Sequence, residues 1–154
     1  MMLETATTIA VIAALVALLS AVYARWQARA AQHANEISLH EGRLSIYRGV
    51  GRFRVHITSR GTGILEEEVW KLAETVELSE FYFPSEIHKR LDEVFKNALR
   101  LLTLNDEWEH RKREDPSTAG ALVEPRHALM RTTRDECQAI TELVKVHLRV
   151  GGTS

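Results

Sequence analysis

The chain has 154 residues, enough for one domain, and its formal net charge of −1 argues against a chain-wide nucleic-acid-binding surface. Its single cysteine, Cys137, excludes an internal disulfide and any site that needs several cysteines. Charge is distributed unevenly, because Glu4 is the only charged residue before Arg25. The composition therefore predicts an apolar start followed by an ordinary charged domain.

The first feature in chain order is an uncharged, mostly apolar segment from Thr5 to Ala24. A helix of this length, at ~1.5 Å per residue, crosses the ~30 Å hydrocarbon core of a bilayer. We therefore predict a transmembrane anchor within residues 1–24. The alternatives are a cleaved signal peptide, disfavoured because no basic region precedes the segment, and a buried core helix, disfavoured because the segment has no polar face.

Membrane-interface residues are predicted at the carboxyl end of this segment. Tyr23 and Trp26 carry amphipathic rings, which favour the interface, and Arg25 and Arg29 place positive charge beside it. Since basic residues stay on the cytoplasmic side, the amino terminus is expected outside and the rest of the chain in the cytoplasm.

Residues 25–60 are predicted to form a basic juxtamembrane helical arm that continues from the anchor, since no strong break precedes Gly61-Thr62-Gly63. Seven arginines and two glutamates give the arm a charge of +5, whereas six glutamates and one lysine give residues 61–83 a charge of −5. The arm could attract anionic lipid, or it could pair with the acidic segment that folds back on it.

Apolar residues recur along the arm at heptad spacing. Ile37 and Leu44 are seven residues apart, as are Leu39 and Ile46. Such seams are typical of coiled coils and predict self-association, which confinement to a membrane would favour by raising the effective concentration. The later helices of the same chain could instead cover this stripe.

Residues 61–150 are predicted to form a cytoplasmic helical domain, and residues 151–154 a short tail. Helical spacing of apolar residues recurs and no strand-period run of convincing length appears, so the expected fold class is all-α. The expected architecture is a transmembrane helix, a long arm and an antiparallel bundle of three to four helices. The predicted helices of the domain span about 64–80, 85–112 and 124–150, with a loop at 115–120.

Few residues suggest chemistry. The aromatic group Trp70, Phe81, Tyr82 and Phe83 is interpreted either as the core of a helical hairpin or as a partner-docking surface. None of the seven histidines has another at the i, i+4 spacing of a helical zinc site, so no catalytic, cofactor-binding or metal-binding residue is predicted, and no cofactor. Cys137 falls on an apolar stripe and is expected to be a small core residue.

The stretch from Glu77 to Leu102, which includes Phe81-Tyr82-Phe83-Pro84, resembles small uncharacterised bacterial single-pass membrane proteins. These share an amino-terminal anchor, a basic arm and a cytoplasmic helical domain of unknown function. The resemblance implies this layout and no activity. Together with the charge bias it places the chain in the inner (cytoplasmic) membrane.

The expected function is a membrane-anchored helical module for protein–protein interaction or assembly, without intrinsic catalysis. Its expected partners are the lipid bilayer and either another protein or further copies of itself, with no nucleic acid. One alternative is a membrane-tethered hydrolytic effector whose histidine and carboxylate site forms only on assembly. Another is a membrane-surface adaptor that acts through the basic arm.

Overall fold

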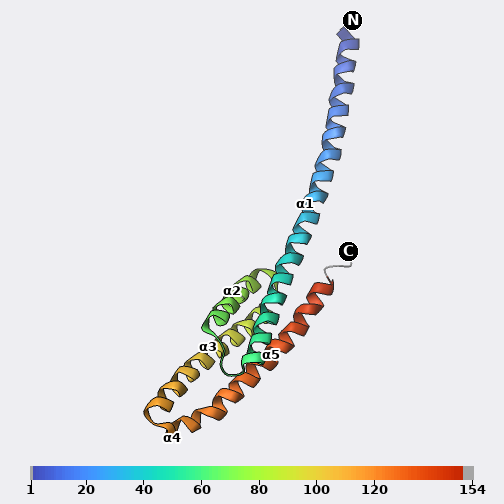
Figure 1. Cartoon of the computed structure of the whole chain (residues 1–154). Helices are drawn as coiled ribbons and strands as arrows, with labels where there is room; N and C mark the ends of the chain where they lie inside the picture. Colours follow the sequence, from blue (N-terminus) through green and yellow to red (C-terminus); the bar gives the residue numbers. More distant parts are fainter. Residues whose placement is uncertain (1, 151–154) are drawn as a thin grey trace. The chain divides into compact units, whose positions relative to one another are not determined.

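The computed structural model describes the backbone of residues 2–150 and the side chains of residues 15–148. This part of the chain is all-α and contains no strand, as predicted (Figure 1). The predicted tail at 151–154 lies outside it. The elements are α1 (Met2–Arg60), α2 (Glu66–Tyr82), α3 (Ser85–Glu114), α4 (Pro116–Ala119), the 3₁₀ helix η1 (Gly120–Leu122) and α5 (Val123–Val150).

The chain divides into two compact units, residues 1–38 and residues 39–154. The first unit consists of helix α1 alone, and its side chains from Leu15 to Ser38 are all exposed. The second unit begins within α1 and contains all the other helices. The boundary therefore falls inside the predicted arm, since residues 25–38 belong to the first unit and residues 39–60 to the second.

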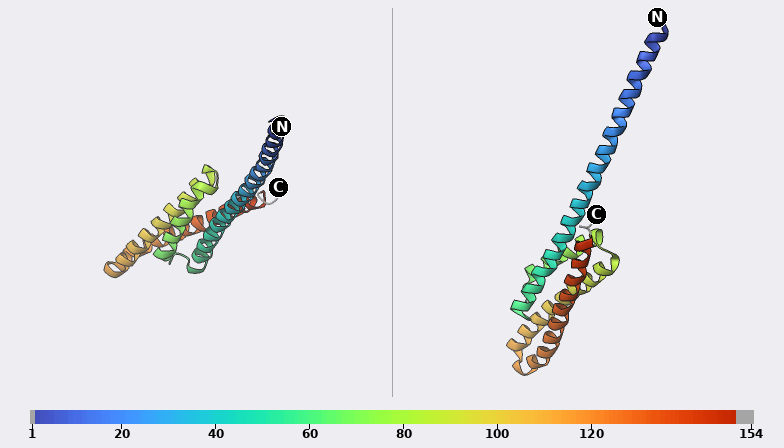
Figure 2. Two further views of the ribbon diagram at one scale, coloured as in Figure 1. Left: turned by 90° about the horizontal axis from the view of Figure 1, so that it is seen from above. Right: turned by 90° about the vertical axis from the view of Figure 1, so that its right-hand side faces the viewer.

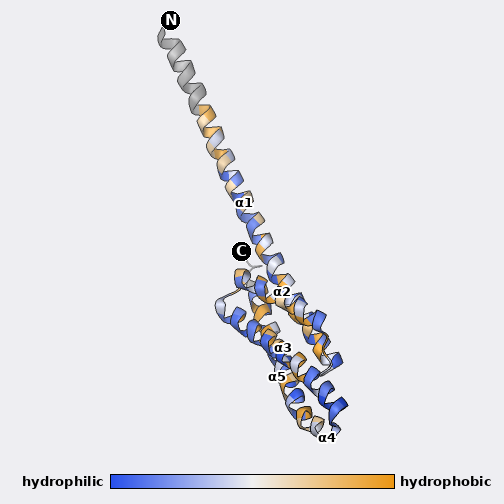
Figure 3. Ribbon diagram, turned by 90° about the vertical axis from the view of Figure 1, so that its left-hand side faces the viewer, coloured by the Kyte–Doolittle hydropathy of each residue, from blue (hydrophilic) through white to orange (hydrophobic). Residues whose placement is uncertain are grey.

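The predicted transmembrane anchor is described only in part. Residues 5–14 lie outside the residues whose side chains the structure describes. In the part of the chain that is described, no helix is both long and apolar enough to cross a membrane. Along α1, hydrophobic residues come first in this part and hydrophilic residues follow (Figure 3). The anchor remains a prediction.

The second unit is a bundle of four antiparallel segments: the carboxyl-terminal part of α1, then α2, α3 and α5 (Figures 1 and 2). Helix α3 packs against both α2 and α5. The α1 segment contacts α2 near Gly49, and it reaches α5 through Arg54, which donates a hydrogen bond to the side-chain oxygen of Gln138. The predicted helical bundle is confirmed for these residues.

One apolar core joins all four segments. Most helical stability in proteins comes from tertiary packing, so the buried apolar faces provide most of the stability, at ~1.5–3 kcal/mol for each large side chain. The core residues are Ile46, Val50, Phe53, Ile57, Ile64, Val69, Leu72, Val76, Phe83, Ile87, Leu91, Val94, Ala98, Leu101, Cys137, Ile140 and Val144.

The connection between α1 and α2 uses a left-handed glycine. Gly61 has a φ of +61° and donates its N–H to the Ile57 carbonyl over 2.9 Å, a common way to end a helix. At the start of α2, Nε2 of His56 accepts a hydrogen bond from the N–H of Leu65 over 3.0 Å. The predicted break at 61–63 is therefore present.

The predicted loop at 115–120 is wrong, because the chain there forms α4 and η1. Oδ1 of Asp115 accepts the Ser117 N–H over 3.1 Å, and Pro116 occupies the first helical position, where it needs no hydrogen-bond partner. Asp-Pro-Ser is a helix-start signal, and this helical turn takes the place of the loop.

Two glycines lie where α1 and α2 approach most closely. A Cβ atom at Gly42 would overlap the ring of Tyr82, and one at Gly49 would overlap the side chain of Thr75. Gly51, by contrast, has open space beside it. Glycine weakens a helix by ~1 kcal/mol relative to alanine, so at Gly42 and Gly49 the close contact with α2 explains its presence.

We expect Gly49→Ala and Gly51→Ala to have opposite effects on the free energy of unfolding. Gly51→Ala should stabilise the protein by ~0.5–1 kcal/mol, because alanine is the better helix former and meets no neighbour. Gly49→Ala should destabilise it by ~1–3 kcal/mol, because the methyl group forces α2 away. Urea unfolding followed by tryptophan fluorescence measures both. Adding Thr75→Ala to Gly49→Ala should recover part of the loss, and equal stability of the two single variants would contradict this packing.

Candidate functional site

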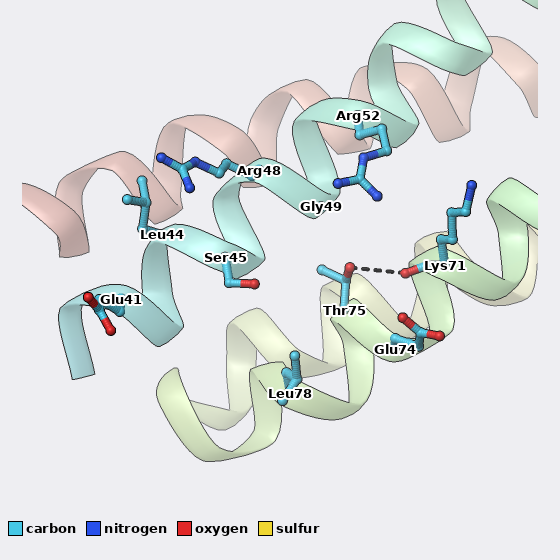
Figure 4. A pocket seen from close by; sticks show the side chains of 10 residues that line it. All are labelled: Glu41, Leu44, Ser45, Arg48, Gly49, Arg52, Lys71, Glu74, Thr75 and Leu78. Atoms are coloured by element: carbon cyan, nitrogen blue, oxygen red, sulfur yellow. Dashed lines mark hydrogen bonds between the residues drawn. The ribbon is translucent and has the colours of Figure 1, made fainter. Parts of the chain in front are cut away.

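A groove of about 640 Å³ runs between α1 and α2 on the outside of the bundle (Figure 4). Ser45 and Gly49 line it on α1, and Thr75 lines it on α2, where its hydroxyl donates a hydrogen bond to the Lys71 carbonyl over 3.1 Å. The other lining residues are charged or aliphatic: Glu41, Leu44, Arg48, Arg52, Lys71, Glu74 and Leu78.

The basic side chains of the groove differ in their partners. Lys71 forms ion pairs of 2.7 Å with both Glu67 and Glu68, and these hydrogen bonds raise the pKa of Lys71. The same interaction with Lys71 lowers the pKa of Glu68. Arg48 and Arg52 are exposed, and among the described residues neither has a hydrogen-bond or ion-pair partner. Arg52 acts on Glu68 only at a distance, as a minor contribution to the lowered pKa of that carboxyl group. Neither guanidinium is in direct contact with an acid of the described chain, so both can form an ion pair with another molecule.

The exposed acidic side chains next to the groove lie on α2. Glu74, Glu77 and Glu80 are exposed and, within the described part of the chain, form no ion pair. The basic arm was expected either to pair with this acidic segment or to attract lipid. No ion pair joins an arginine of α1 to a glutamate of α2 among the described residues. Arg43 instead donates a hydrogen bond to the backbone carbonyl of Tyr82 over 3.2 Å.

The predicted aromatic group is divided between core and surface. Phe83 is buried, with its ring edge against His147 at 5.7 Å between centroids, and Tyr82 is half-buried against Gly42. Trp70 is 53% exposed and rests on Phe95 at 6.1 Å between centroids. Phe81 is 77% exposed. Of the four, Phe81 is the most exposed, and Phe83 is not available to a partner because it lies in the core.

The residues of the two predicted heptad seams of the arm also differ in how deeply they are buried. Ile46 is fully buried among the residues of its own chain, contrary to its interpretation as an association residue. Leu39 is half-buried. Leu44 is half-buried at the groove, and Ile37, in the first unit, is 51% exposed. Of the seam formed by Leu39 and Ile46, only Ile46 therefore belongs to the intrachain core.

The predicted membrane-interface residues all have exposed side chains. Tyr23 and Trp26 lie on the same side of α1, with their ring centroids 6.3 Å apart, and Arg25 and Arg29 are likewise exposed. All four belong to the first unit. Because they are exposed, these side chains are free to contact lipid headgroups, as residues at a membrane interface must.

A buried serine–histidine pair links α2 to α3. Ser79 Oγ lies 2.9 Å from Nδ1 of His88 and donates a hydrogen bond to the Val76 carbonyl over 2.5 Å. Nδ1 of His88 also lies 3.2 Å from the Val76 carbonyl, which can only accept, so both contacts are satisfied by the tautomer that carries its proton on Nδ1. In that tautomer Nδ1 donates to the serine and does not act as a base toward it. Ser79 is also fully buried. This pair fastens two helices together, and nothing in the sequence spacing indicated it.

The remaining polar groups do not converge on a reactive centre. Within the described residues, no three His, Cys, Asp or Glu side chains come close enough to hold a metal ion. Cys137 is fully buried, and burial raises the pKa of its thiol to about 12. A thiol in this state is almost entirely protonated near neutral pH, which agrees with the interpretation of Cys137 as a core residue.

An arginine that has no ion-pair partner among the described residues joins α5 to α3 and to the turn between α1 and α2. Arg126 of α5 donates to Oδ1 of Asn105 over 2.8 Å and to Oγ1 of Thr62 over 3.3 Å. Its guanidinium stacks 4.3 Å from the ring centre of Trp108. Burial lowers the pKa of Arg126. No residue spacing indicates this contact, because its members are distant along the chain.

We expect Arg126→Lys to destabilise the protein by ~1–3 kcal/mol, because lysine cannot reproduce the paired hydrogen bonds and the planar stacking. Arg131→Lys is the matched control. Arg131 lies on the same helix in an exposed ion pair of 2.7 Å with Glu124, and its replacement should change stability by less than ~0.5 kcal/mol. Thermal unfolding followed by circular dichroism measures both. Equal effects of the two substitutions would show that Arg126 does not tie the elements together.

No protein-family model, curated protein or solved structure matches the chain. The resemblance of residues 77–102 to small bacterial membrane proteins therefore remains a prediction.

Proposed function

We propose that this chain is a membrane-anchored helical module that binds protein through the outer face of the α1–α2 hairpin. This face, the outer hairpin face, consists of Leu44, Arg48 and Arg52 on α1 and Glu74, Glu77, Leu78 and Phe81 on α2. The anchor is the apolar segment from Thr5 to Ala24 in the inner membrane, with the helical domain on the cytoplasmic side.

The observation that supports the interaction surface is the exposure of Phe81 and Leu78 on a helix whose other face is fully packed. Phe81 is 77% and Leu78 43% exposed, although α2 already buries a complete apolar stripe in the core. Aromatic side chains are enriched among the residues that contribute most to binding between proteins. The unpaired charges beside them provide specificity for a partner of complementary charge.

The anchor is supported by the sequence. Twenty uncharged residues precede Arg25 and Arg29, and this length matches the hydrocarbon core of a bilayer. Anchorage confines the module to two dimensions, which raises the effective concentration of any partner in the same membrane. A small exposed face is then sufficient for binding.

We expect Val11→Arg together with Leu15→Arg to release the full chain from membranes, because each arginine near the centre of a span costs ~2.5–3.5 kcal/mol. Ala28→Arg with Ala31→Arg adds the same charge beyond the predicted span and should leave the chain in the membrane fraction. Carbonate extraction of membranes followed by immunoblotting measures the distribution. The anchor would be wrong if the first variant remained in the membrane pellet or if the unmodified chain were extracted.

A photoreactive benzoyl-phenylalanine in place of Phe81 should form a discrete crosslinked product on irradiation of intact membranes, because the side chain lies on the binding face. The same group in place of Val146, which is 58% exposed on α5, is the control for chance collisions and should give no such product. Leu78→Glu, which alters the same face, should remove the Phe81 product. Gel electrophoresis and mass spectrometry identify the product. Equal crosslinking from both positions would contradict the assigned face.

A further inference from the structure

The register between α1 and α2 is fixed at two places. Gly42 lies against Tyr82, and Gly49 lies against Thr75. Both pairs are separated by seven residues along their helices, and the helices run in opposite directions. Positions on α1 and α2 whose residue numbers add up to about 124 are therefore level with each other along the hairpin.

The outer hairpin face carries complementary residues at the same levels. Leu44 is level with Phe81, Arg48 with Glu77 and Arg52 with Glu74, because each pair adds up to within two of the fixed value. At ~1.5 Å rise per residue, two residues correspond to ~3 Å, which these side chains can span. In the described part of the chain the two arginines and the two glutamates have no ion-pair partner.

We propose that the partner of the outer hairpin face is a second copy of this chain, related by a two-fold axis parallel to α1 and α2. Such a rotation places α1 of each copy over α2 of the other without changing the levels. Arg48 and Arg52 of one copy then meet Glu77 and Glu74 of the other, and Leu44 meets Phe81. The interface forms twice, which makes it isologous and closed.

Two features favour this arrangement over other occupants. The face is self-complementary, since Arg48 and Arg52 lie on its α1 half and Glu74 and Glu77 on its α2 half, whereas an anionic lipid surface would be repelled by the two glutamates. The rotation also leaves residue 39 of both copies at the same end of the pair. Two chains held in one membrane meet in this orientation, so the inference rests on the anchored module proposed above, and membrane confinement compensates for the small area.

The test exchanges charges between copies, using the full chain in phosphatidylcholine vesicles with donor- and acceptor-labelled molecules. Arg48→Glu with Arg52→Glu makes the face acidic, and Glu74→Arg with Glu77→Arg makes it basic. Each variant alone should lose the energy transfer, with association weakened about tenfold or more, because like charges oppose each other across the interface. A mixture of the two variants should recover the energy transfer, since opposite charges then meet in both halves of the pair.

Controls separate this pairing from other roles of the same residues. Arg131→Glu, which alters an exposed arginine of α5, should leave the energy transfer unchanged, and circular dichroism should show all variants folded. If the mixture did not recover the energy transfer, the charges would act within one chain, and the proposal would be overturned. If only the arginine variant lost the energy transfer and the glutamate variant kept it, Glu74 and Glu77 would not face the arginines of a second copy, and the proposal would also be overturned.

The result can be distinguished from a failure of the proposed function. If the unmodified copies show only random energy transfer while Phe81 still crosslinks a different protein in membranes, the second copy is excluded and the binding face stands. If Phe81 gives no specific product, the binding face itself fails.

Discussion

The close approach of α1 and α2 at Gly42 and Gly49 is the constraint on which the second unit depends. A Cβ atom at Gly42 would overlap the ring of Tyr82, and one at Gly49 would overlap the side chain of Thr75, so a larger residue at either position requires α2 or these side chains to shift. The contact sets the height of every residue on α2 relative to α1. The lining of the groove and the levels of the charged residues on the outer hairpin face both follow from it.

Buried polar groups add specificity to this packing. Ser79 and His88 join α2 to α3 by a side-chain hydrogen bond, and Arg126 joins α5 to α3 and to the turn after α1. A buried polar group without a partner costs more than an apolar one, so each of these contacts disfavours alternative arrangements of the helices. No buried side-chain nitrogen or oxygen in the described part of the chain lacks a hydrogen-bond partner. The apolar core provides the stability, and these contacts select one arrangement.

The outer hairpin face is the opposite case, because its charged side chains form no ion pair with one another in the described part of the chain. Arg48 and Arg52 are exposed beside Glu74, yet no ion pair forms between them in the part of the chain that the structure describes. Exposed ion pairs are worth little in water, so leaving them open costs the isolated chain almost nothing. The same charges gain more when a partner excludes water from them. A face of this kind favours recognition over stability.

The sequence by itself determined the helical class and most helix boundaries, because helical periodicity and turn residues act over short distances. It missed the helical turn after Asp115, where Asp-Pro-Ser signals a helix start. It could not decide which heptad seam of the arm would be covered, since Leu39 with Ile46 and Ile37 with Leu44 have the same spacing. Only the tertiary structure placed Ile46 in the core, exposed Phe81 but buried Phe83, and gathered Arg126, Asn105 and Thr62. The physical reason is that these outcomes depend on which helices pack together, and that contact joins residues far apart in the chain.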